Sequence, residues 1–489
     1  KYIIGIDGGS QSTKIVMYDL EGNAICEGKE NLKPMYLAPG DIVEHPGDDL
    51  WDSLCAAAQK LMKTFQGDVK DIIGIGVGSI RCCRVLMKAD GTLAAPVISW
   101  QDARVARPYE HANKDVAYVT STAGYLIHRL TGTWNDNIAN YFGQWPVDFY
   151  TWKWSDKPEE FKQFQIPREM LFNMMLPGSQ AGSITEAAFR ATGFPEGLPV
   201  ISATSDKPVE ALGAGLLDES DGVISLGTYI ALMIMGGEVP QNPVAFWPLM
   251  SSIPHKLIYE GYGIRRGMWT VSWFRELLGD SPVQRAKELG LSTEDYLNRE
   301  AEKVPPGSDG LMTVLDWLAN PWEPFKRGIM IGFNAHMNFA SMYRSILEGI
   351  AYTLKNNFDA MCQELHKTLS GIIITGGGSN SDLFMQIFAD VFNLPAKRNE
   401  INGSASLGAA INTAVAAGSY KSYEEAVQRM VRVRDTFYPI PKNVDVYERL
   451  NRQAYKRIPF YTDEVLKKTY EVLNSDQNKE GVITKWSQT

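Results

Sequence analysis

The residues that follow an early glycine turn limit what this chain can fold into. Tyr2 to Ile6 is a short apolar run that ends in Asp7-Gly8-Gly9, which predicts a buried strand stopped by a turn. Lys14 to Tyr18 is then apolar and β-branched, and Asp19 to Asn23 supplies another turn before Ala24 to Gly28. This pattern predicts a β-hairpin directly after the glycine turn.

The hairpin decides which kind of phosphate-binding turn this can be. A P-loop or a Rossmann fingerprint runs from its glycine turn into a helix, whose N-terminus binds phosphate. Here a strand follows, and the pattern Gly-x-x-x-x-Gly-Lys is absent. The sequence therefore argues against a Walker-type NTPase, although turn N–H groups can still form an anion-binding concavity.

Length and composition bound the class of protein. A chain of 489 residues with 44% apolar and 21% charged residues predicts a globular protein with two large domains. Its net charge of -9 argues against nucleic acid as a partner. The five cysteines and six histidines show no metal-ligand spacing. No stretch approaches the ~20 apolar residues of a membrane helix, and no signal peptide is visible, so we expect a cytoplasmic protein.

Strands and helices alternate along the first half. Residues 48–65 have the apolar spacing of an amphipathic helix, and residues 72–77, 97–99 and 198–202 have the composition of buried strands. This alternation predicts an α/β fold.

The strand–turn–strand pattern of the N-terminus occurs a second time near residue 222. Gly222 to Leu226 predicts a strand, Gly227-Thr228 a turn of small residues, and Tyr229 to Met235 a second strand. Two related halves that face each other across a cleft could hold an anion between two such turns. We therefore predict an N-terminal domain over residues 1–218 and a C-terminal domain over residues 219–489.

The rest of the second half continues the α/β pattern. Residues 340–365 predict a long helix, and Gly371 to Thr375 predicts a strand that ends in a glycine-rich turn. Residues 382–392 predict an amphipathic helix, capped by Ser381 or Asn380. The Tyr438-Pro439-Ile440-Pro441 segment breaks the chain before a helical tail, from about residue 442, to which we assign no chemistry.

Six short motifs, each weak singly, occur in one order along the chain. They are Asp7-x-Gly9-Ser10-x-Ser12-x-Lys14, Trp100-x-Asp102-x-Arg104, Ser205-Asp206, Gly227-Thr228, the helix Tyr343 to Gly349, and Gly376-Gly377-Gly378 through Gln386. The ordered set resembles the actin-like ATPase core of the FGGY carbohydrate kinase family over nearly the whole chain. The sequence most resembles uncharacterised enterobacterial members of that family.

The resemblance implies two actin-like (ribonuclease H-like) domains that flank a deep cleft. The N-terminal domain would bind sugar and phosphate, and the C-terminal domain would bind the nucleotide. The implied activity is transfer of a phosphoryl group from ATP, with Mg²⁺, to a hydroxyl of a sugar, ketose, polyol or sugar acid.

Asp7 is the candidate magnesium ligand. It lies at the end of a predicted buried strand, and magnesium often takes only one or two carboxylates because it keeps several waters. The alternative is a turn aspartate that bonds its own backbone. Lys14 could reach a phosphate or be a solvated hairpin residue. The resemblance assigns phosphate and nucleotide contacts to Gly9, Ser10, Ser12, Thr13, Lys14, Gly227, Thr228, Gly377, Gly378 and Asn380.

Asp206 is the candidate general base. It follows an apolar strand, which is where doubly wound sheets place their ligands. An ordinary aspartate is ionised at pH 7 but is a weak base, so it would chiefly orient the sugar hydroxyl and accept its proton late. The alternative is that Asp206 only caps the helix that follows.

The sugar-binding candidates are those around the predicted strand ends. Arg81 stands where glycerol kinases carry a substrate arginine, while Cys82 stands where they have glutamate; the alternative for Arg81 is a surface salt bridge. Lys207 hints at an anionic substrate or at a structural ion pair. Trp100, Asp102 and Arg104 are further candidates, and Trp100 is also explained by core packing.

Two departures from the family leave the acceptor open. The connection between Arg104 and Leu130 is shorter than family members have. The segment Gly403 to Ser406 lacks the acidic residue that family members often have before Leu407-Gly408. An alternative function is a nucleotide- or sugar-binding sensor with little catalysis, and a more distant one is an actin- or chaperone-like ATPase. Homodimers are the commonest assemblies of soluble proteins, so a homodimer is the default expectation.

Overall fold

The chain forms two compact units in the computed structural model, which describes residues 1–320 and 322–475. The first unit comprises Lys1–Glu219, Met233–Glu260 and Asn399–Val433, and the second comprises Ser220–Leu232, Gly261–Arg398 and Arg434–Thr489. Two segments from later in the chain therefore complete the first unit. These discontinuous units and the two continuous domains predicted above divide the chain differently.

A six-stranded sheet forms the centre of the first unit. Its strand order is β13-β14-β6-β1-β2-β3. The strands are β1 (Tyr2–Gly8), β2 (Ser12–Asp19), β3 (Ala24–Asn31), β6 (Ile72–Ser79), β13 (Ser179–Ser183) and β14 (Pro199–Ser205). β2 pairs antiparallel with both β1 and β3, so the predicted hairpin after the glycine turn is confirmed. β6 lies parallel to β1 and to β14.

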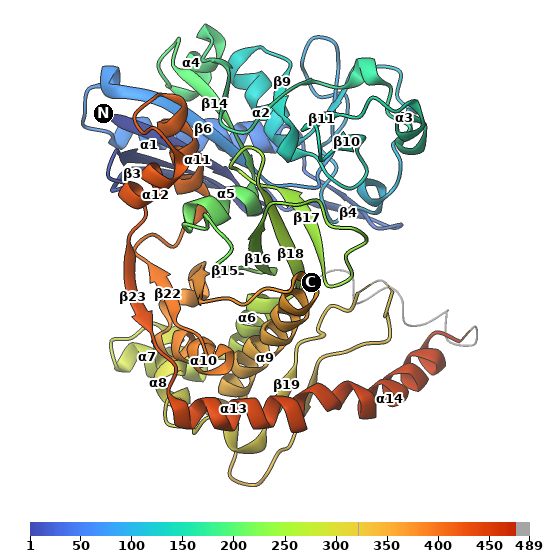
Figure 1. Ribbon diagram of the computed structural model, residues 1–489, viewed down its shortest axis with the longest axis vertical. Coiled ribbons are helices and arrows are strands. Elements are labelled where there is room, and N and C mark those ends of the chain that lie inside the picture. Colours follow the sequence, from blue (N-terminus) through green and yellow to red (C-terminus); the bar gives the residue numbers. More distant parts are fainter. Residues whose placement is uncertain (321, 476–489) are drawn as a thin grey trace. The chain divides into compact units, whose positions relative to one another are not determined.

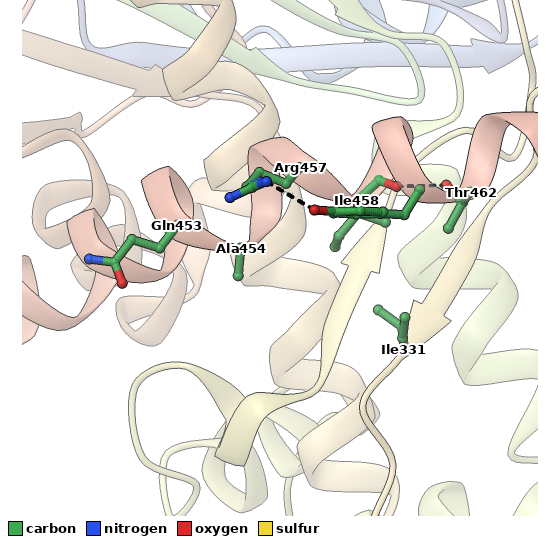
Figure 2. A pocket seen from close by; sticks show the side chains of 7 residues that line it. Ile331, Gln453, Ala454, Arg457, Ile458 and Thr462 are labelled. Atoms are coloured by element: carbon green, nitrogen blue, oxygen red, sulfur yellow. Dashed lines mark hydrogen bonds between the residues drawn. The ribbon is translucent and has the colours of Figure 1, made fainter.

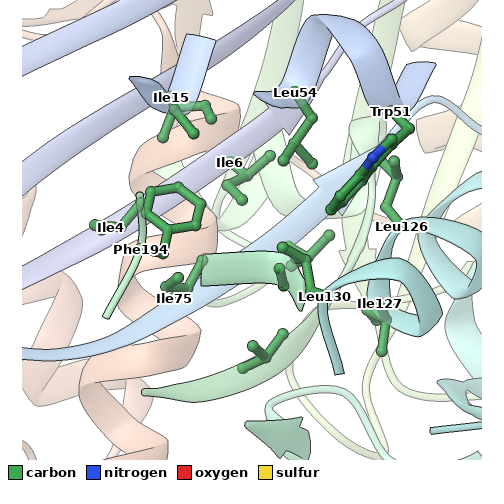
Figure 3. Close-up of a cluster of buried hydrophobic side chains, with 14 of the residues drawn as sticks. Ile4, Ile6, Ile15, Trp51, Leu54, Ile75, Leu126, Ile127, Leu130 and Phe194 are labelled. Carbon is green, nitrogen blue, oxygen red and sulfur yellow. The ribbon is translucent and has the colours of Figure 1, made fainter. Parts of the chain in front are cut away.

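One face of this sheet is covered by apolar packing from α1 (Asp49–Thr64) and α2 (Thr122–Thr131). Alternate residues of the strands, such as Ile4, Ile6 and Ile15, point to this face and are fully buried. Figure 3 shows them packed with Leu54 from α1. Full burial of each such side chain contributes about 1.5–3 kcal/mol, so this layer is the main core of the unit.

The opposite face is covered by α11 (Ser404–Ala416), which comes from far along the chain and lies beside β1 and β6 (Figure 1). Glycine makes this approach possible, because a Cβ atom on Gly5 would lie 1.9 Å from the Ser406 carbonyl oxygen. A Cβ atom on Gly76 would lie 2.1 Å from the Ala409 carbonyl oxygen. The Tyr18 hydroxyl and Ser406 Oγ are 2.8 Å apart, which joins this helix to β2.

Helix α5 (Asp206–Gly213) packs against α11 within the same unit. Their backbones meet at glycines, since a Cβ atom on Gly408 would lie 1.9 Å from the Val209 carbonyl oxygen. The first unit also contains β4 (Tyr36–Ala38), β5 (Ile42–Glu44), β7 (Val85–Met87), β8 (Tyr118–Thr120), β9 (Asn135–Asn137), β10 (Val147–Asp148), β11 (Lys153–Trp154), α3 (Pro158–Phe164), β12 (Asn173–Met175), α4 (Glu186–Thr192), β17 (Phe246–Met250) and α12 (Tyr423–Met430).

The second unit is built on parallel strands and long helices. β21 (Gly371–Thr375) lies parallel to β15 (Asp221–Leu226) and to β22 (Ala396–Asn399). The helices are α6 (Gly267–Leu277), α7 (Asp280–Glu288), α8 (Thr293–Ala301), α9 (Phe339–Leu365), α10 (Asp382–Phe392), α13 (Pro441–Gln453) and α14 (Ile458–Leu473), with the short strands β19 (Met312–Val314) and β20 (Ile329–Ile331). The chain passes from one unit to the other between Glu219 and Ser220, at the last residue of β22, and within β16 (Ile230–Gly236), β18 (Leu257–Ile264) and β23 (Val433–Phe437).

A buried ion pair lies inside α9. Arg344 Nε donates to Glu348 Oε1 at 2.8 Å, and the Tyr447 hydroxyl of α13 donates to the same oxygen at 2.8 Å. Both charged side chains are buried, so loss of either one would leave an uncompensated charge in the core. The predicted cap of α10 is Ser381, whose Oγ accepts from the Phe384 N–H.

Two predicted elements differ from those observed. Residues 97–99 form isolated bridges from Ile98 to Glu44 and to Arg84, so the predicted strand there is wrong; one bridge on each side does not propagate into a ladder. The predicted helical tail is two helices, α13 and α14, which are separated at Ala454 (φ -127°, ψ -63°) and a short 3₁₀ turn. Pro459 in the first turn of α14 has no N–H to continue a helix from before it.

Candidate active site

Three parallel strands of the first unit end side by side. Gly8 at the end of β1 lies opposite Ser79 at the end of β6, and Ser79 lies opposite Ser205 at the end of β14. The residues at or just beyond these ends are Asp7, Arg81 and Asp206. The topology therefore brings together three candidates that are far apart in the sequence, at the edge where parallel sheets place ligands.

Arg81 is held by a buried carboxylate that the sequence analysis did not single out. Its Nη1 and Nη2 atoms donate to the two carboxylate oxygens of Glu260 at 2.5 and 2.7 Å. The Glu260 side chain is 0% exposed and that of Arg81 is 13% exposed. Burial alone would lower the pKa of Arg81, but Glu260 outweighs it and raises that pKa. Arg81 therefore does form a salt bridge, as the alternative expects, but with a fully buried partner and not at the surface.

Asp206 lies beside this pair. Its Oδ1 is 3.6 Å from Arg81 Nε, which is an ion-pair distance but too long for a hydrogen bond. Asp206 is the first residue of α5, and Ser205 occupies the N-cap position. The only hydrogen bond of the Asp206 side chain within the described residues is from the adjacent Lys207 N–H at 3.0 Å. Its carboxylate thus keeps acceptor positions for another group.

Burial and the charges around Asp206 shift the pKa of its carboxyl group. Burial is the largest effect and raises its pKa, while Arg81 and Lys207 lower it and Glu210 raises it further. Lys207 Nζ lies 2.9 Å from Glu210 Oε2 on the next turn of α5. The ion-pair explanation of Lys207 is thus present in the structure.

Asp7 lies on the same edge, directly opposite Lys14 in the pairing of β1 with β2. Burial raises its pKa to about 7, and Asp206 and Glu210 add to this effect. Its carboxylate forms no hydrogen bond within residues 1–320 and 322–475, so the turn-aspartate alternative has no supporting contact there. A buried acid in the field of two other acids suits a hydrated cation. No group of three or more His, Cys, Asp or Glu side chains in the described part is placed to hold a metal.

Several polar groups in and after the turn that follows β1 are bonded to other groups of the protein. The Gly9 N–H donates to the Ser12 carbonyl oxygen at 3.1 Å and closes the turn. Ser10 lies within this turn. The Thr13 hydroxyl is 2.7 Å from Ser53 Oγ of α1, so its side chain points to the apolar face, away from Asp7. Lys14 Nζ pairs with Glu27 at 2.9 Å and is about one-third exposed, as the solvated-hairpin alternative expects.

The other sugar-side candidates form two groups. Cys82 is exposed and has a φ of 61°, and burial of the surrounding site raises the pKa of its thiol to about 12. Asp102 accepts from Arg104 Nε at 2.9 Å and from the Val43 N–H at 2.7 Å, which makes it a structural anchor of its loop. Trp100 is 38% exposed. No hydrogen bond or ion pair joins Trp100, Asp102 or Arg104 to Asp206 within the part of the chain described.

The nucleotide-side candidates meet within the second unit. Ser225 of β15 lies opposite Thr375 of β21, so the turns that follow these strands are neighbours. They contain Gly227, Thr228, Gly377, Gly378 and Asn380. A Cβ atom on Gly378 would lie 2.8 Å from a Leu226 side-chain carbon, whereas one on Gly377 would meet nothing within 4 Å. Gly378 is thus a packing glycine, and Gly377 leaves open space beside the turn.

A separate hollow lies where α13 meets α14 (Figure 2). Its lining includes Ile331, Ile458 and Arg457, which donates to the Tyr461 hydroxyl at 2.9 Å. None of the predicted site residues lines it, and its lining contains no carboxylate, histidine or cysteine. It is therefore not the site of the chemistry.

Sequence reasoning missed Glu260 and the role of Gly408. A glutamate directly after the apolar run Leu257 to Tyr259 and just before Gly261 is a usable signal, because a buried charge needs a partner. The contact of Gly408 with α5 gave no signal, since the two helices are distant in sequence.

Two models of the FGGY family of carbohydrate kinases match this chain. The model of the N-terminal domain matches residues 2–122 and 107–213, and the model of the C-terminal domain matches residues 222–417. The chain is 64% identical over 487 residues to the uncharacterised sugar kinase YgcE of Escherichia coli (strain K12), covering 100% of this chain and 99% of that protein. The chain belongs to the FGGY family and is a carbohydrate kinase.

Solved structures agree on the fold. The xylulose kinase of Rhodospirillum rubrum superposes with a TM-score of 0.82 at 20% identity, covering 96% of this chain and 100% of that one. The gluconate kinase of Lactobacillus acidophilus gives a TM-score of 0.82 at 20% identity, covering 96% and 99%. Among the described residues, no helix has the length and apolar character needed to cross a bilayer.

Proposed function

We propose that this carbohydrate kinase transfers the γ-phosphoryl group of ATP to a hydroxyl of a ketose, polyol or sugar acid, with Asp206 as the general base. The observation that supports this best is the placement of Asp206 at the end of β14, beside Arg81 and with free acceptor positions on its carboxylate. The family supports phosphorylation of a sugar by ATP.

Asp206 would bind and orient the acceptor hydroxyl. Phosphoryl transfer asks the protein mainly for positioning and charge stabilisation, so a weak base is adequate. Because burial raises its pKa, Asp206 is a stronger base than an exposed aspartate and accepts the proton more readily as transfer proceeds. Arg81 and Lys207 oppose that shift and lower the pKa of Asp206.

Asp7 is the residue that would hold a hydrated Mg²⁺, and its lack of a hydrogen-bond partner in the described residues fits that role. When bound, the ion would neutralise charge on the phosphates. Gly227, Thr228, Gly377, Gly378 and Asn380 would contact the nucleotide, and Gly9, Ser10, Ser12 and Lys14 its phosphates. For Thr13, only the backbone suits this role, because its hydroxyl bonds Ser53.

The acceptor is best sought first among uncharged sugars. Each cation beside Asp206 already pairs with a carboxylate of its own: Arg81 with Glu260, and Lys207 with Glu210. The structural likeness to kinases named for xylulose and for gluconate makes sugar acids the second class to test.

The test is ADP release in the presence of MgATP across a panel of pentuloses, hexuloses, polyols and aldonates. At least one acceptor should stimulate ADP release, and the Asp206→Ala variant should lose this stimulation while it still binds nucleotide. Absence of stimulation by every acceptor would count against the proposal. Tight sugar binding without turnover would favour the sensor alternative. The homodimer and the cytoplasmic location stay predictions.

A further inference from the structure

Glu260 contributes a buried negative charge next to the candidate base, yet it does not approach Asp206 through a bond of its own. Its contact is with Arg81, and it uses both of its oxygens there, at 2.5 and 2.7 Å. The side chain is 0% exposed, so breaking this pair would leave a charge in the interior without compensation.

The geometry of the guanidinium makes this pairing directional. Arginine donates through a rigid planar fork, so fixing two of its nitrogens fixes the third. With both Nη atoms on Glu260, the Nε edge faces Asp206 at 3.6 Å. The Phe142 ring, whose centroid is 5.6 Å from the guanidinium carbon, flanks the same group.

This arrangement keeps a cation near Asp206 without occupying its carboxylate oxygens. A guanidinium free to turn would form two parallel hydrogen bonds with the nearest carboxylate, which is the geometry arginine favours. On Asp206, those bonds would occupy the oxygens that the acceptor hydroxyl needs. Glu260 competes for the Nη atoms and holds them away.

We propose that Glu260 is a positioning residue, which holds the Nη atoms of Arg81 so that Arg81 supports Asp206 without pairing to it through its fork. This inference rests on the proposed role of Asp206 as the base. Arg81 and Asp206 are then not sufficient by themselves. A second carboxylate, that of Glu260 from β18, must be present for the base to be available.

Crystal structures of the wild-type protein and of Glu260→Gln test the geometry without any need for turnover. The amide keeps the shape of the side chain but accepts with one oxygen only. We expect the Nη atoms of Arg81 to move to within hydrogen-bond distance of Asp206 in the variant. An Arg81 that stays on the introduced amide and leaves Asp206 unbonded would overturn the inference. Glu260→Asp, which keeps the charge but has a shorter reach, serves if the first variant does not fold.

Kinetics then test the consequence. We expect Glu260→Gln to lower kcat about 100-fold while the KM for ATP is unchanged, because an occupied base is lost to the reaction. In the double variant Arg81→Met/Glu260→Met no guanidinium is left to occupy Asp206, so its kcat should exceed that of Glu260→Gln, although its sugar KM rises. A double variant slower than the single one would contradict the mechanism.

Glu348→Gln is the matched control, because Glu348 is also a buried carboxylate paired with an arginine but lies in α9. It should lower the stability and leave kcat unchanged. If wild-type protein phosphorylates no acceptor, the proposed function fails, and the two crystal structures still decide whether Glu260 restrains Arg81.

Discussion

The Nε atom of Arg81 lies 3.6 Å from Oδ1 of Asp206, while Glu260 occupies the two Nη atoms of the same guanidinium. The distance is short enough to stabilise the Asp206 carboxylate and too long to consume an acceptor position on it. The carboxylate of Asp206, the proposed base, is therefore held near a cation and keeps acceptor positions for a hydroxyl group.

Replacing Asp206 by asparagine should lower kcat by about 10²–10⁴-fold, because the amide cannot accept the hydroxyl proton. Nucleotide affinity should stay unchanged. The measurement is acceptor-dependent ADP release together with calorimetric titration of ATP. Asp90→Asn, which changes an exposed acid of the same unit, is the control and should keep full activity. An Asp206→Asn enzyme with near-normal kcat would remove Asp206 from the role of base.

Asp7→Asn should stabilise the protein at pH 8 in buffer free of divalent ions. The folded-state pKa of Asp7 is raised from 3.8 to about 7, so between these values the folded chain holds a proton that the unfolded chain has released. Wild-type stability contributed by this group therefore falls as pH rises through that window. We expect the variant to gain about 1–2 kcal/mol at pH 8 by urea unfolding, with a smaller gain at pH 5. Equal gains at both pH values would show that Asp7 does not titrate in this range.

Cys82 should react slowly with iodoacetamide at pH 8 although the residue is exposed. Burial of its surroundings raises the thiol pKa to about 12, and the thiolate is the reactive form. Mass spectrometry of the Cys82 peptide against time should show far slower alkylation in the native protein than in urea. Cys82→Ser identifies the signal. Native alkylation as fast as that of the unfolded chain would mean that the thiol ionises readily in the site.

Gly5→Ala should destabilise the first unit by about 1–3 kcal/mol, because the new methyl group would overlap the Ser406 carbonyl of α11. Thermal or urea unfolding measures the loss. Gly403→Ala is the matched control at the start of α11, where a Cβ atom would lie 3.8 Å from Lys14 Nζ, an ordinary contact. Equal effects of the two changes would argue against close packing of α11 on β1.

Much of the fold could be predicted from local patterns. The hairpin after Gly9, the helix at residues 49–64 and the capped helix at residues 382–392 follow from periodicity, turn residues and an N-cap serine, all of which act over a few residues. The bridge at Ile98 was mistaken for a strand, because three apolar or small residues do not reveal whether a ladder continues beyond them.

The contacts of the candidate site depended on long-range topology and could not be predicted in the same way. Arg81 and Glu260 are 179 positions apart and come from elements of two different sheets, so no local pattern pairs them. Thr13 shows the opposite limit. Its place in the motif predicts a nucleotide contact, and only the structure shows that the alternation of β2 directs its hydroxyl to Ser53 and leaves the backbone for that contact.

The position of α11 has a consequence for how the chain is made. The strands β1 and β6 emerge from the ribosome early, but α11 (Ser404–Ala416), which packs on their glycine face, is made much later. Because synthesis proceeds at about 5–20 residues per second, that face stays incompletely covered for many seconds while the second unit is being translated. The part of the molecule that carries Asp206 is thus the first to begin folding and among the last to be completed.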